Sequence, residues 1–289
     1  MKDETAKLFP RTTVAGISLP RILIGTNWML GYSHTGAAAD AMINARFGEN
    51  LAPFEAMLEA YMEYGIDAIM APIRANPNLL KAIRNTEQKL GRGITMIDTP
   101  IVDVSDNDSA RRETEANFKE CAEIGCKFCL IHHSSAEQLV NKNLEQIPRL
   151  PDYLSMIRDA GMIPGLSAHM PELILYSDKN EYDVETYIQI FNCAGFLMQV
   201  EVETVARIIH NAKKPVMTIK AMAAGRVTPY VGITFSFAAL RDCDMVTIGA
   251  HRPAEVHEDV EIAFAALEHR YPVIGGRSSP AKQQSVLRG

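Results

Sequence analysis

The stretch ITMIDTPIVDVSDNDSARRETEANFKECAEIGCKFCLIHH, residues 94–133, contains the pattern that decides the fold. Its two ends, 94–100 and 127–133, are short runs of apolar and β-branched residues, which predict buried strands. Between them, 109–125 is a longer amphipathic segment that stops at Gly125, which predicts a helix. A helical connection of this length usually joins parallel neighbours, so the stretch predicts one strand–helix–strand unit of a parallel sheet.

The same unit recurs along the chain. Eight strands are expected, at 21–27, 66–72, 94–100, 127–133, 162–169, 184–192, 215–221 and 244–251. Helices are expected at 50–65, 76–91, 109–125, 171–177, 202–212, around 234–242 and at 253–270, with a broken helical region near Pro148 and Pro151. Eight units of roughly 30 residues predict an α/β protein with a closed (β/α)₈ TIM barrel. The alternative, an open doubly wound sheet, usually carries G-x-G-x-x-G after its first strand, and GTNWMLG (25–31) lacks that pattern.

Two segments lie outside this repeat. Residues 11–19 contain a turn-like glycine between short alternating pieces, so we expect a β-hairpin that plugs the bottom of the barrel. Residues 275–289 are rich in Gly, Ser, Pro and charge, so we expect a loosely packed tail. No linker separates the repeats, and the sequence predicts a single domain over residues 1–289.

Composition and charge argue against several classes of protein. The formal net charge of −6 does not favour a nucleic-acid-binding surface or a polybasic membrane patch. No apolar run approaches the roughly 20 residues of a membrane-spanning helix, and the polar N-terminus, MKDETAKLFPRT, lacks the apolar core of a secretory signal. We therefore expect a cytoplasmic protein whose partner is a small molecule, with its oligomeric state left open.

The five cysteines do not predict a disulfide framework. Cys121, Cys126 and Cys129 have a C-x4-C-x2-C spacing that superficially resembles an iron–sulfur motif. However, Cys121 lies in a predicted helix and Cys129 in a predicted strand, and no fourth cysteine is nearby. We expect reduced cysteines that act as small buried apolar residues.

Polar residues gather at the carboxyl ends of the predicted strands, where enzymes of this fold carry their active sites. Five of the eight histidines lie at these ends or in the loops after them: His34, His132, His133, His169 and His251. This distribution predicts a functional pocket, with the general polarity of loops as the alternative. The candidate substrate-binding residues at these ends are Asn27, Trp28, Tyr32, His34, Asn192 and His251. Trp28 and Tyr32 could form a stacking wall for a sugar or another ring, unless Trp28 is a core aromatic.

Asp98, His132 or His133, and His169 end three neighbouring strands. Two imidazoles and a carboxylate can bind a divalent ion such as Zn²⁺ or Mn²⁺ and leave positions open for substrate. The same residues could act without a metal as general acid, base and orienting group, or they could be structural. Because side chains alternate along a strand, one of His132 and His133 must point away from the barrel axis, and we favour His132 for the pocket.

Two basic residues complete the candidate site. Lys220 ends an apolar strand, and an inward lysine with a depressed pKa could form a Schiff base or polarise a carbonyl. The alternative is a salt bridge to a neighbouring carboxylate. The candidate catalytic residues are thus Asp98, His132, His169 and Lys220. Arg252 could bind an anion together with the N–H groups of the last predicted helix, or it could be an exposed arginine.

Three stretches resemble the aldo-keto reductase superfamily. TTVAGISLPRILIGTNWMLG (12–31) is similar to that family's N-terminal hairpin and first strand, and YIQIFNCAGF (187–196) to its sixth strand. KPVMTIKAMAAGRVTP (214–229) and DMVTIGAHRPAEVHEDVEIA (244–263) resemble its seventh and eighth strands with the turns that follow them. The resemblance implies the family's barrel and an NADP(H) site near Lys220, Gly225, Arg252 and Glu255.

The chain departs from that family at the catalytic tetrad, which consists of an Asp and a Tyr after the second strand, a Lys at the third and a His at the fourth. Here the second strand ends APIRANP (71–77), and Asp98 stands where the Lys is expected. Only His132 or His133 matches, so the Tyr proton donor and its Lys partner are missing.

Three functions remain open from the sequence. The first is an enzyme that acts on a small polar compound, such as a carbohydrate derivative, by His and Asp acid–base chemistry. It would work with or without a divalent metal, as a lyase, isomerase or hydrolase. The second is a divergent NADP-dependent oxidoreductase. The third is a barrel that binds a small molecule without catalysis.

Overall fold

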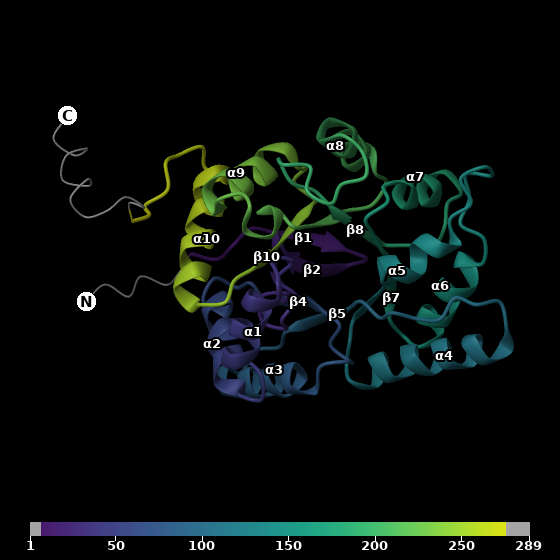
Figure 1. Cartoon of the computed structure of the whole chain (residues 1–289), viewed down its shortest axis with the longest axis horizontal. Coiled ribbons are helices and arrows are strands. Elements are labelled where there is room, and N and C mark those ends of the chain that lie inside the picture. Colours follow the sequence, from purple (N-terminus) through teal and green to yellow (C-terminus); the bar gives the residue numbers. More distant parts are fainter. Residues whose placement is uncertain (1–6, 276–289) are drawn as a thin grey trace.

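A computed structural model describes residues 7–275 of the chain, and Figure 1 shows helices arranged around a ring of strands. The predicted loose tail, 275–289, falls outside the described residues except for Gly275. Within the described part of the chain, no helix is both long enough and apolar enough to cross a membrane.

Eight parallel strands form a closed barrel, which confirms the predicted (β/α)₈ fold. The strands are β3 (Ile22–Gly25), β4 (Ala68–Ala71), β5 (Thr95–Asp98), β6 (Phe128–Ile131), β7 (Ile163–Ala168), β8 (Thr186–Ile190), β9 (Val216–Ile219) and β10 (Met245–Gly249). The ring closes where β10 pairs with β3, from Val246 opposite Ile22 to Gly249 opposite Gly25. Every strand lies inside the range predicted for it, because fully buried parallel strands are continuous apolar runs.

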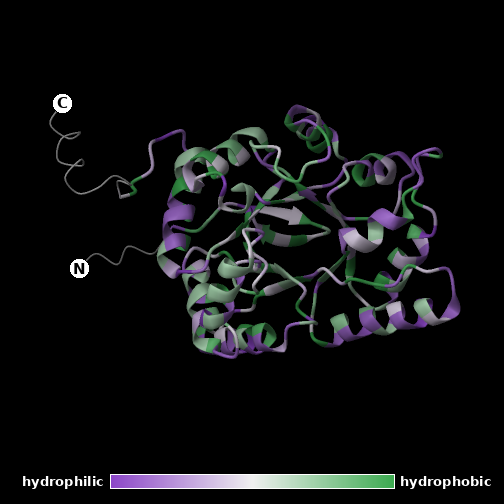
Figure 2. Cartoon of the chain, in the orientation of Figure 1, coloured by the Kyte–Doolittle hydropathy of each residue, from purple (hydrophilic) through white to green (hydrophobic). Residues whose placement is uncertain are grey.

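Helices cover the outside of the barrel (Figure 1). They are α1 (Ala37–Arg46), α2 (Leu51–Met62), α3 (Pro77–Leu90), α4 (Asp108–Glu123), α5 (His133–Ala136), α6 (Leu150–Asp159), α7 (Glu172–Lys179), α8 (Val202–Asn211), α9 (Pro229–Ala239) and α10 (Pro253–Leu267), with 3₁₀ turns η1 (Glu137–Leu139) and η2 (Ala223–Gly225). In Figure 2 the outlying α4 alternates between hydrophilic and hydrophobic residues, as expected for a helix with one face on the protein. The sequence did not predict α1, which lies inside the long loop after β3.

The N-terminal hairpin closes one end of the barrel. Its strands, β1 (Arg11–Val14) and β2 (Ile17–Pro20), pair in antiparallel fashion around a turn. Val14 and Leu19 are buried and pack in one cluster with the side chains that fill the barrel interior, among them Leu23. The predicted plug is therefore present, and it leaves the opposite end, at the carboxyl ends of the strands, as the open one.

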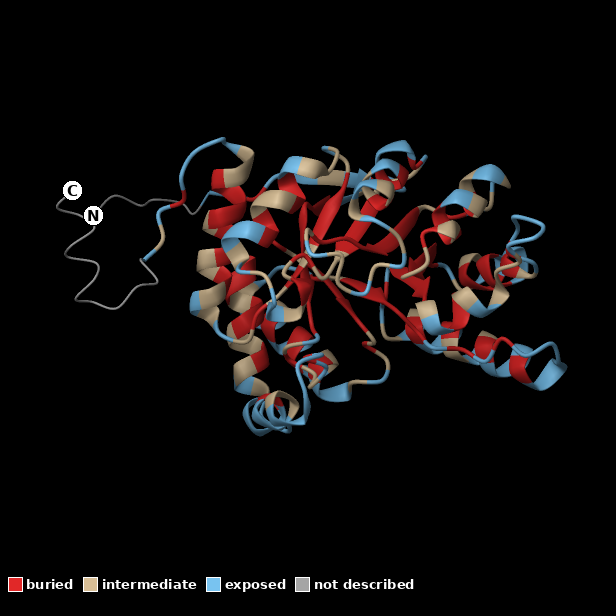
Figure 3. Ribbon diagram, turned by 45° about the horizontal axis from the view of Figure 1, so that its top comes forward, coloured by how far each residue is buried: buried red, intermediate tan, exposed pale blue. Residues whose placement is uncertain are grey.

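The pleat of each strand divides its side chains between the barrel interior and the layer of helices. In β5, Ile97 packs in the interior cluster, whereas Met96 packs in the outer cluster with the helices. In β9, Met217 belongs to the interior and Val216 to the outer layer. Figure 3 colours the barrel strands largely as buried, since helices cover their outer face. A residue at a strand end thus takes its direction from its position in the pleat.

A buried ionic cluster holds the strands together where the barrel closes. The carboxylate of Asp244, which is fully buried, accepts the N–H of Val216 at 2.9 Å and the guanidinium of Arg241 at 2.7 and 2.9 Å. Arg21, just before β3, donates to the carbonyl oxygens of Asp244 and Arg241. The start of the first barrel strand is thereby bonded to the last two.

We expect Asp244→Ala to lower the free energy of unfolding by about 3–5 kcal/mol, because it leaves the Arg241 guanidinium without its carboxylate. Urea denaturation followed by circular dichroism measures this loss. Asp242→Ala is the matched control, since the Asp242 carboxylate is fully exposed in its ion pair with Arg21, and it should unfold like the unmodified protein. Equal stability of the two variants would show that the cluster does not hold the ring closed.

Candidate active site

A cavity of about 960 Å³ opens at the carboxyl ends of the barrel strands. Its floor consists of interior side chains such as Met70, Ile188 and Ile219. Loops from around the barrel form its walls, and the predicted site residues along them are Asn27, Trp28, Tyr32, His34, Asp98, His132, His133, His169, Lys220, His251 and Glu255. The fold therefore brings together residues that are more than 200 positions apart in the chain.

Three imidazoles from two adjacent strands lie against one another at this opening. The rings of His133 and His169 stack with their centroids 3.6 Å apart and an interplanar angle of 15°. The ring of His132 lies 4.2 Å from that of His133. His132 also caps α5, because its Nδ1 accepts the backbone N–H of Ser134 at 3.3 Å. The rings form a contiguous imidazole surface over the barrel.

Both His132 and His133 line the cavity, so the prediction that one of them points away is wrong. Strand β6 ends at Ile131, and the backbone turns into α5 at His132. The pleat therefore does not extend to His133, and the first turn of α5 returns that side chain to the opening.

Burial keeps the three imidazoles uncharged. It is the main cause that lowers the pKa of His132 to about 4, and the neighbouring His133 and Lys220 add to the effect. Burial, again with His133 and Lys220, lowers the pKa of His169 to about 3. Burial also lowers the pKa of His133 below its ordinary value of 6.5. At pH 7 these side chains are therefore neutral.

Glu137 supports this imidazole surface, and the sequence analysis did not identify it. Glu137 accepts the backbone N–H groups of His169 and Met170 at 2.6 and 2.8 Å, and its carboxylate lies 4.0 Å from Nδ1 of His133. The signal that could have identified it is the spacing of four residues between His133 and Glu137, which places both on one helical face.

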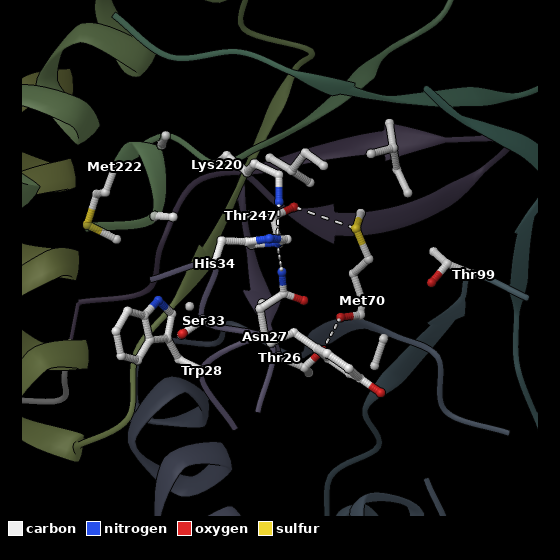
Figure 4. A pocket seen from close by; sticks show the side chains of 18 of the residues that line it. Thr26, Asn27, Trp28, Ser33, His34, Met70, Thr99, Lys220, Met222 and Thr247 are labelled. Atoms are coloured by element: carbon white, nitrogen blue, oxygen red, sulfur yellow. Dashed lines mark hydrogen bonds between the residues drawn. The ribbon is translucent and has the colours of Figure 1, made fainter. Parts of the chain in front are cut away.

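Lys220 enters the cavity because its backbone leaves the strand geometry. Ile219, the last residue of β9, packs toward the interior, so continued alternation would turn Lys220 outward. Instead Lys220 has a φ of 63°, in the left-handed region that side chains other than glycine rarely adopt. Its ammonium nitrogen Nζ lies 2.8 Å from Nε2 of His34, and Figure 4 shows the two side chains pointing at each other.

Burial lowers the pKa of Lys220 to about 8. Among the described residues, no carboxylate forms a salt bridge with this lysine, and its bonding partner is the imidazole of His34. The alternative of a strand-end salt bridge is therefore wrong. A substantial fraction of Lys220 is the neutral, nucleophilic amine near pH 7–8.

Asp98 borders the cavity, but its carboxylate does not face it. Like Met96, Asp98 is turned toward the helices, and its Oδ2 accepts the N–H of Arg74 at 2.9 Å and lies 3.6 Å from the thiol of Cys121. Burial raises the pKa of this carboxyl. The prediction of Asp98 as an acid–base group beside the histidines is not supported by this placement, because the pleat separates them.

The predicted metal ligands Asp98, His132 and His169 do not form a binding set. Within residues 7–275, no group of three or more His, Cys, Asp or Glu side chains is arranged to hold a metal ion. The histidine rings stack instead of converging on one point, and the carboxylate lies in the outer layer. The arrangement of these side chains therefore does not support the predicted zinc or manganese site.

The three clustered cysteines are as expected. Cys121, Cys126 and Cys129 are free and buried.

Trp28 forms a stacked platform on another wall of the cavity. Its indole stacks on His251 with the ring centroids 5.5 Å apart, and Nδ1 of His251 lies 3.0 Å from the carboxylate of Glu255. Gly225 and Gly249 border the indole, and an added Cβ at either position would lie at ordinary van der Waals distance from it, 4.0 or 3.7 Å. Tyr32 is half exposed at the rim. This wall can accept a flat or ring-shaped group.

Two predicted binding residues, Asn192 and Arg252, do not line the cavity. Asn192 is fully buried, and its amide bonds the backbone of Ala194 and Phe196, so it shapes the loop after β8 instead of contacting a ligand. Arg252 is exposed at the N-cap of α10, and its carbonyl oxygen accepts the N–H groups of Glu255 and Val256. These first-turn donors are therefore used within the helix.

Only part of the residue set that the resemblance implies for NADP(H) lines the cavity. Lys220, Gly225 and Glu255 line it, as the resemblance implies. Arg252 does not line it, so the implied set is incomplete at this opening. No step of the chemistry below is routed through NADP(H).

The structure is similar to solved barrels at low sequence identity. A putative aldo-keto reductase from Pseudomonas aeruginosa aligns with a TM-score of 0.63 and 14% identity, covering 92% of this chain and 100% of that one. An aldo-keto reductase from Klebsiella pneumoniae, solved with NADPH, aligns with a TM-score of 0.55 and 14% identity, covering 97% and 95%. A ribulose-1,5-bisphosphate carboxylase/oxygenase from Pyrococcus horikoshii aligns with a TM-score of 0.54 and 12% identity, covering 82% of this chain and 58% of that one.

No protein-family model and no curated protein sequence matches the chain. At these identities, the structural matches establish the fold alone. The chain therefore has a divergent aldo-keto-reductase-like (β/α)₈ fold, with a different set of residues at the mouth of its barrel.

Proposed function

We propose that the protein is an enzyme of lyase or isomerase type that forms an imine between Lys220 and a small carbonyl compound. The observation that carries this proposal is the state of Lys220. Its amine lies inside the cavity, burial lowers its pKa to about 8, and it bonds an imidazole where most lysines bond a carboxylate. A desolvated lysine of this kind is the nucleophile that carbonyl chemistry requires.

The imidazole surface supplies the proton transfers that follow imine formation. A protonated imine withdraws electrons from the neighbouring carbon, so a base that removes a proton from an adjacent O–H or C–H group can break or isomerise a bond there. His132, His133 and His169 are neutral at pH 7 and stand at the same opening. Neutral imidazoles can accept hydrogen bonds from the substrate and shuttle its protons, and burial makes these rings weaker bases than a free histidine.

The shape of the cavity supports a small polar substrate with a ring or a chain of hydroxyl groups. Trp28 offers a flat surface on one wall, and the polar groups of Asn27, Ser167 and Thr247 border the same space. The carboxylate of Glu255 disfavours a phosphorylated substrate end beside it. A small sugar-like aldehyde or ketone satisfies these conditions.

Reduction with sodium cyanoborohydride tests the imine. Incubation with glycolaldehyde or dihydroxyacetone should place a reduced adduct on the peptide that contains Lys220, because the neutral amine attacks the carbonyl carbon. Intact-mass and peptide mass spectrometry measure the adduct, and Lys220→Met should abolish it at that site. Lys81→Met, at an exposed lysine of α3, is the matched control and should retain the Lys220 adduct.

Absence of selective labelling at Lys220 with every small aldehyde and ketone tested would contradict the proposal. The alternative function, a barrel that binds a small molecule without catalysis, gains support if those compounds bind and raise the melting temperature of the protein but never become attached to Lys220.

The pH dependence of Lys220 reactivity gives a second test. A pKa lowered to about 8 means that the neutral amine increases as the pH rises toward 8 and is nearly complete one unit above it. Competitive labelling with acetic anhydride should therefore rise to a plateau near pH 9, whereas ordinary exposed lysines continue to gain reactivity at higher pH. A Lys220 profile that coincides with those of the exposed lysines would remove the basis for a nucleophilic role.

A further inference from the structure

We propose that His34 is the catalytic base that takes the proton from the Lys220 ammonium group and returns it to the departing hydroxyl during imine formation. This inference rests on the proposed imine chemistry at Lys220. It assigns His34, which the sequence suggested only as a substrate contact, to the reacting nitrogen itself.

The geometry of the pair determines which atom accepts the proton. An ammonium group has donors only, so in the contact of 2.8 Å the protonated Lys220 donates and Nε2 of His34 accepts. The amide nitrogen of Asn27, also a donor, lies 3.4 Å from the same Nε2 (Figure 4). Nε2 therefore carries a lone pair aimed at Lys220, and the ring proton is on Nδ1.

The loop that carries His34 is built to hold this position. The N–H of Ser33 donates to Asp40 in α1 at 2.9 Å, and the N–H of Thr35 donates to the hydroxyl of Ser33 at 3.1 Å. From the loop after β9, the guanidinium of Arg226 donates to the carbonyl oxygen of His34 at 3.3 Å. The first two bonds hold the loop after β3 in place, and the Arg226 bond joins that loop to the loop after β9 beside the Lys220–His34 contact.

Backbone strain occurs at both members of the pair. His34 has a φ of 56° and Lys220 a φ of 63°, and neither is a glycine. Such conformations cost free energy and persist where the surrounding structure enforces them, often at functional sites. That two strained residues from distant parts of the chain meet through their side chains indicates that the contact itself is maintained.

The groups that face His34 keep its imidazole in the neutral form. Lys220 and Arg226 are positive, Asp40 is negative, and His169 is the nearby imidazole. Burial and the charge of Lys220 lower the pKa of His34, and the opposing effect of Asp40 is smaller. His34 is therefore neutral at pH 7, when much of Lys220 still needs to lose a proton.

The proposed step balances without any co-reactant. His34 removes one proton from the ammonium group, and the neutral amine attacks the carbonyl carbon to form the C–N bond. A proton then moves from nitrogen to the former carbonyl oxygen, which gives a neutral carbinolamine. The His34 imidazolium protonates the hydroxyl, which leaves as water while the nitrogen lone pair forms the C=N⁺ bond, so the products are a protonated imine and one water.

The experiment measures the rate of cyanoborohydride-trapped adduct formation at Lys220 with glycolaldehyde at pH 7. We expect His34→Ala to reduce this rate by about 100-fold, the lower range for the loss of a general base. Free imidazole added to the variant should restore much of the rate, and more basic substituted imidazoles should restore more. His210→Ala, at an exposed histidine of α8, is the matched control and should react like the unmodified protein.

The outcomes separate the two proposals. If the unmodified protein forms no adduct at Lys220, the proposed function fails. If it does, and His34→Ala reacts at an undiminished rate or is slowed without any rescue by imidazole, the role of His34 as the base is refuted while imine formation stands. Should His34→Ala fail to fold, His34→Gln serves instead, because its amide accepts the hydrogen bond of Lys220 but cannot take its proton, and an undiminished rate in that variant also overturns the proposal.

Discussion

The pleat of a closed parallel barrel is the constraint on which the site depends. Hydrogen bonding fixes the register of β3 to β10 around the ring, so each side chain faces either the packed interior or the helices. Side chains of the residues just after a strand continue its alternation between the interior and the helices, unless the backbone changes conformation there. The interior is filled and plugged by the hairpin, and the mouth at the carboxyl ends is where polar side chains can meet.

Two departures from the pleat assemble the chemistry at that mouth. The turn into α5 brings His133 beside His132 and His169, and the left-handed backbone at Lys220 turns its amine over the barrel. Both features place polar groups in a cavity with an apolar floor, where burial lowers the pKa of the imidazoles and of the amine. The same desolvation that costs stability therefore produces neutral bases beside a reactive amine.

This chain has the fold of aldo-keto reductases with a different set of residues at the mouth of the barrel. The structural matches to aldo-keto reductases extend over nearly the whole chain, yet the tetrad residues of that family are replaced after β4 and in β5. The Trp28–His251–Glu255 wall and the Lys220–His34 pair line the mouth of the barrel in this chain. A function inferred from the fold alone would have placed a reductase here, whereas the proposed imine chemistry rests on the residues of the site.

The sequence by itself determined the eight strands, the hairpin and the residues at the open end, because buried parallel strands are apolar runs and polar strand ends interrupt them. It also held the information that Asp98 faces outward, since Asp98 shares the alternation of Met96. Only the tertiary structure decided the position of His133 and the left-handed conformation of Lys220. It also decided that Asn192 bonds its own loop and that the side chains of Lys220 and His34 are in contact. These depend on backbone turns and on loops from distant strands, which packing selects and no local pattern of residue types specifies.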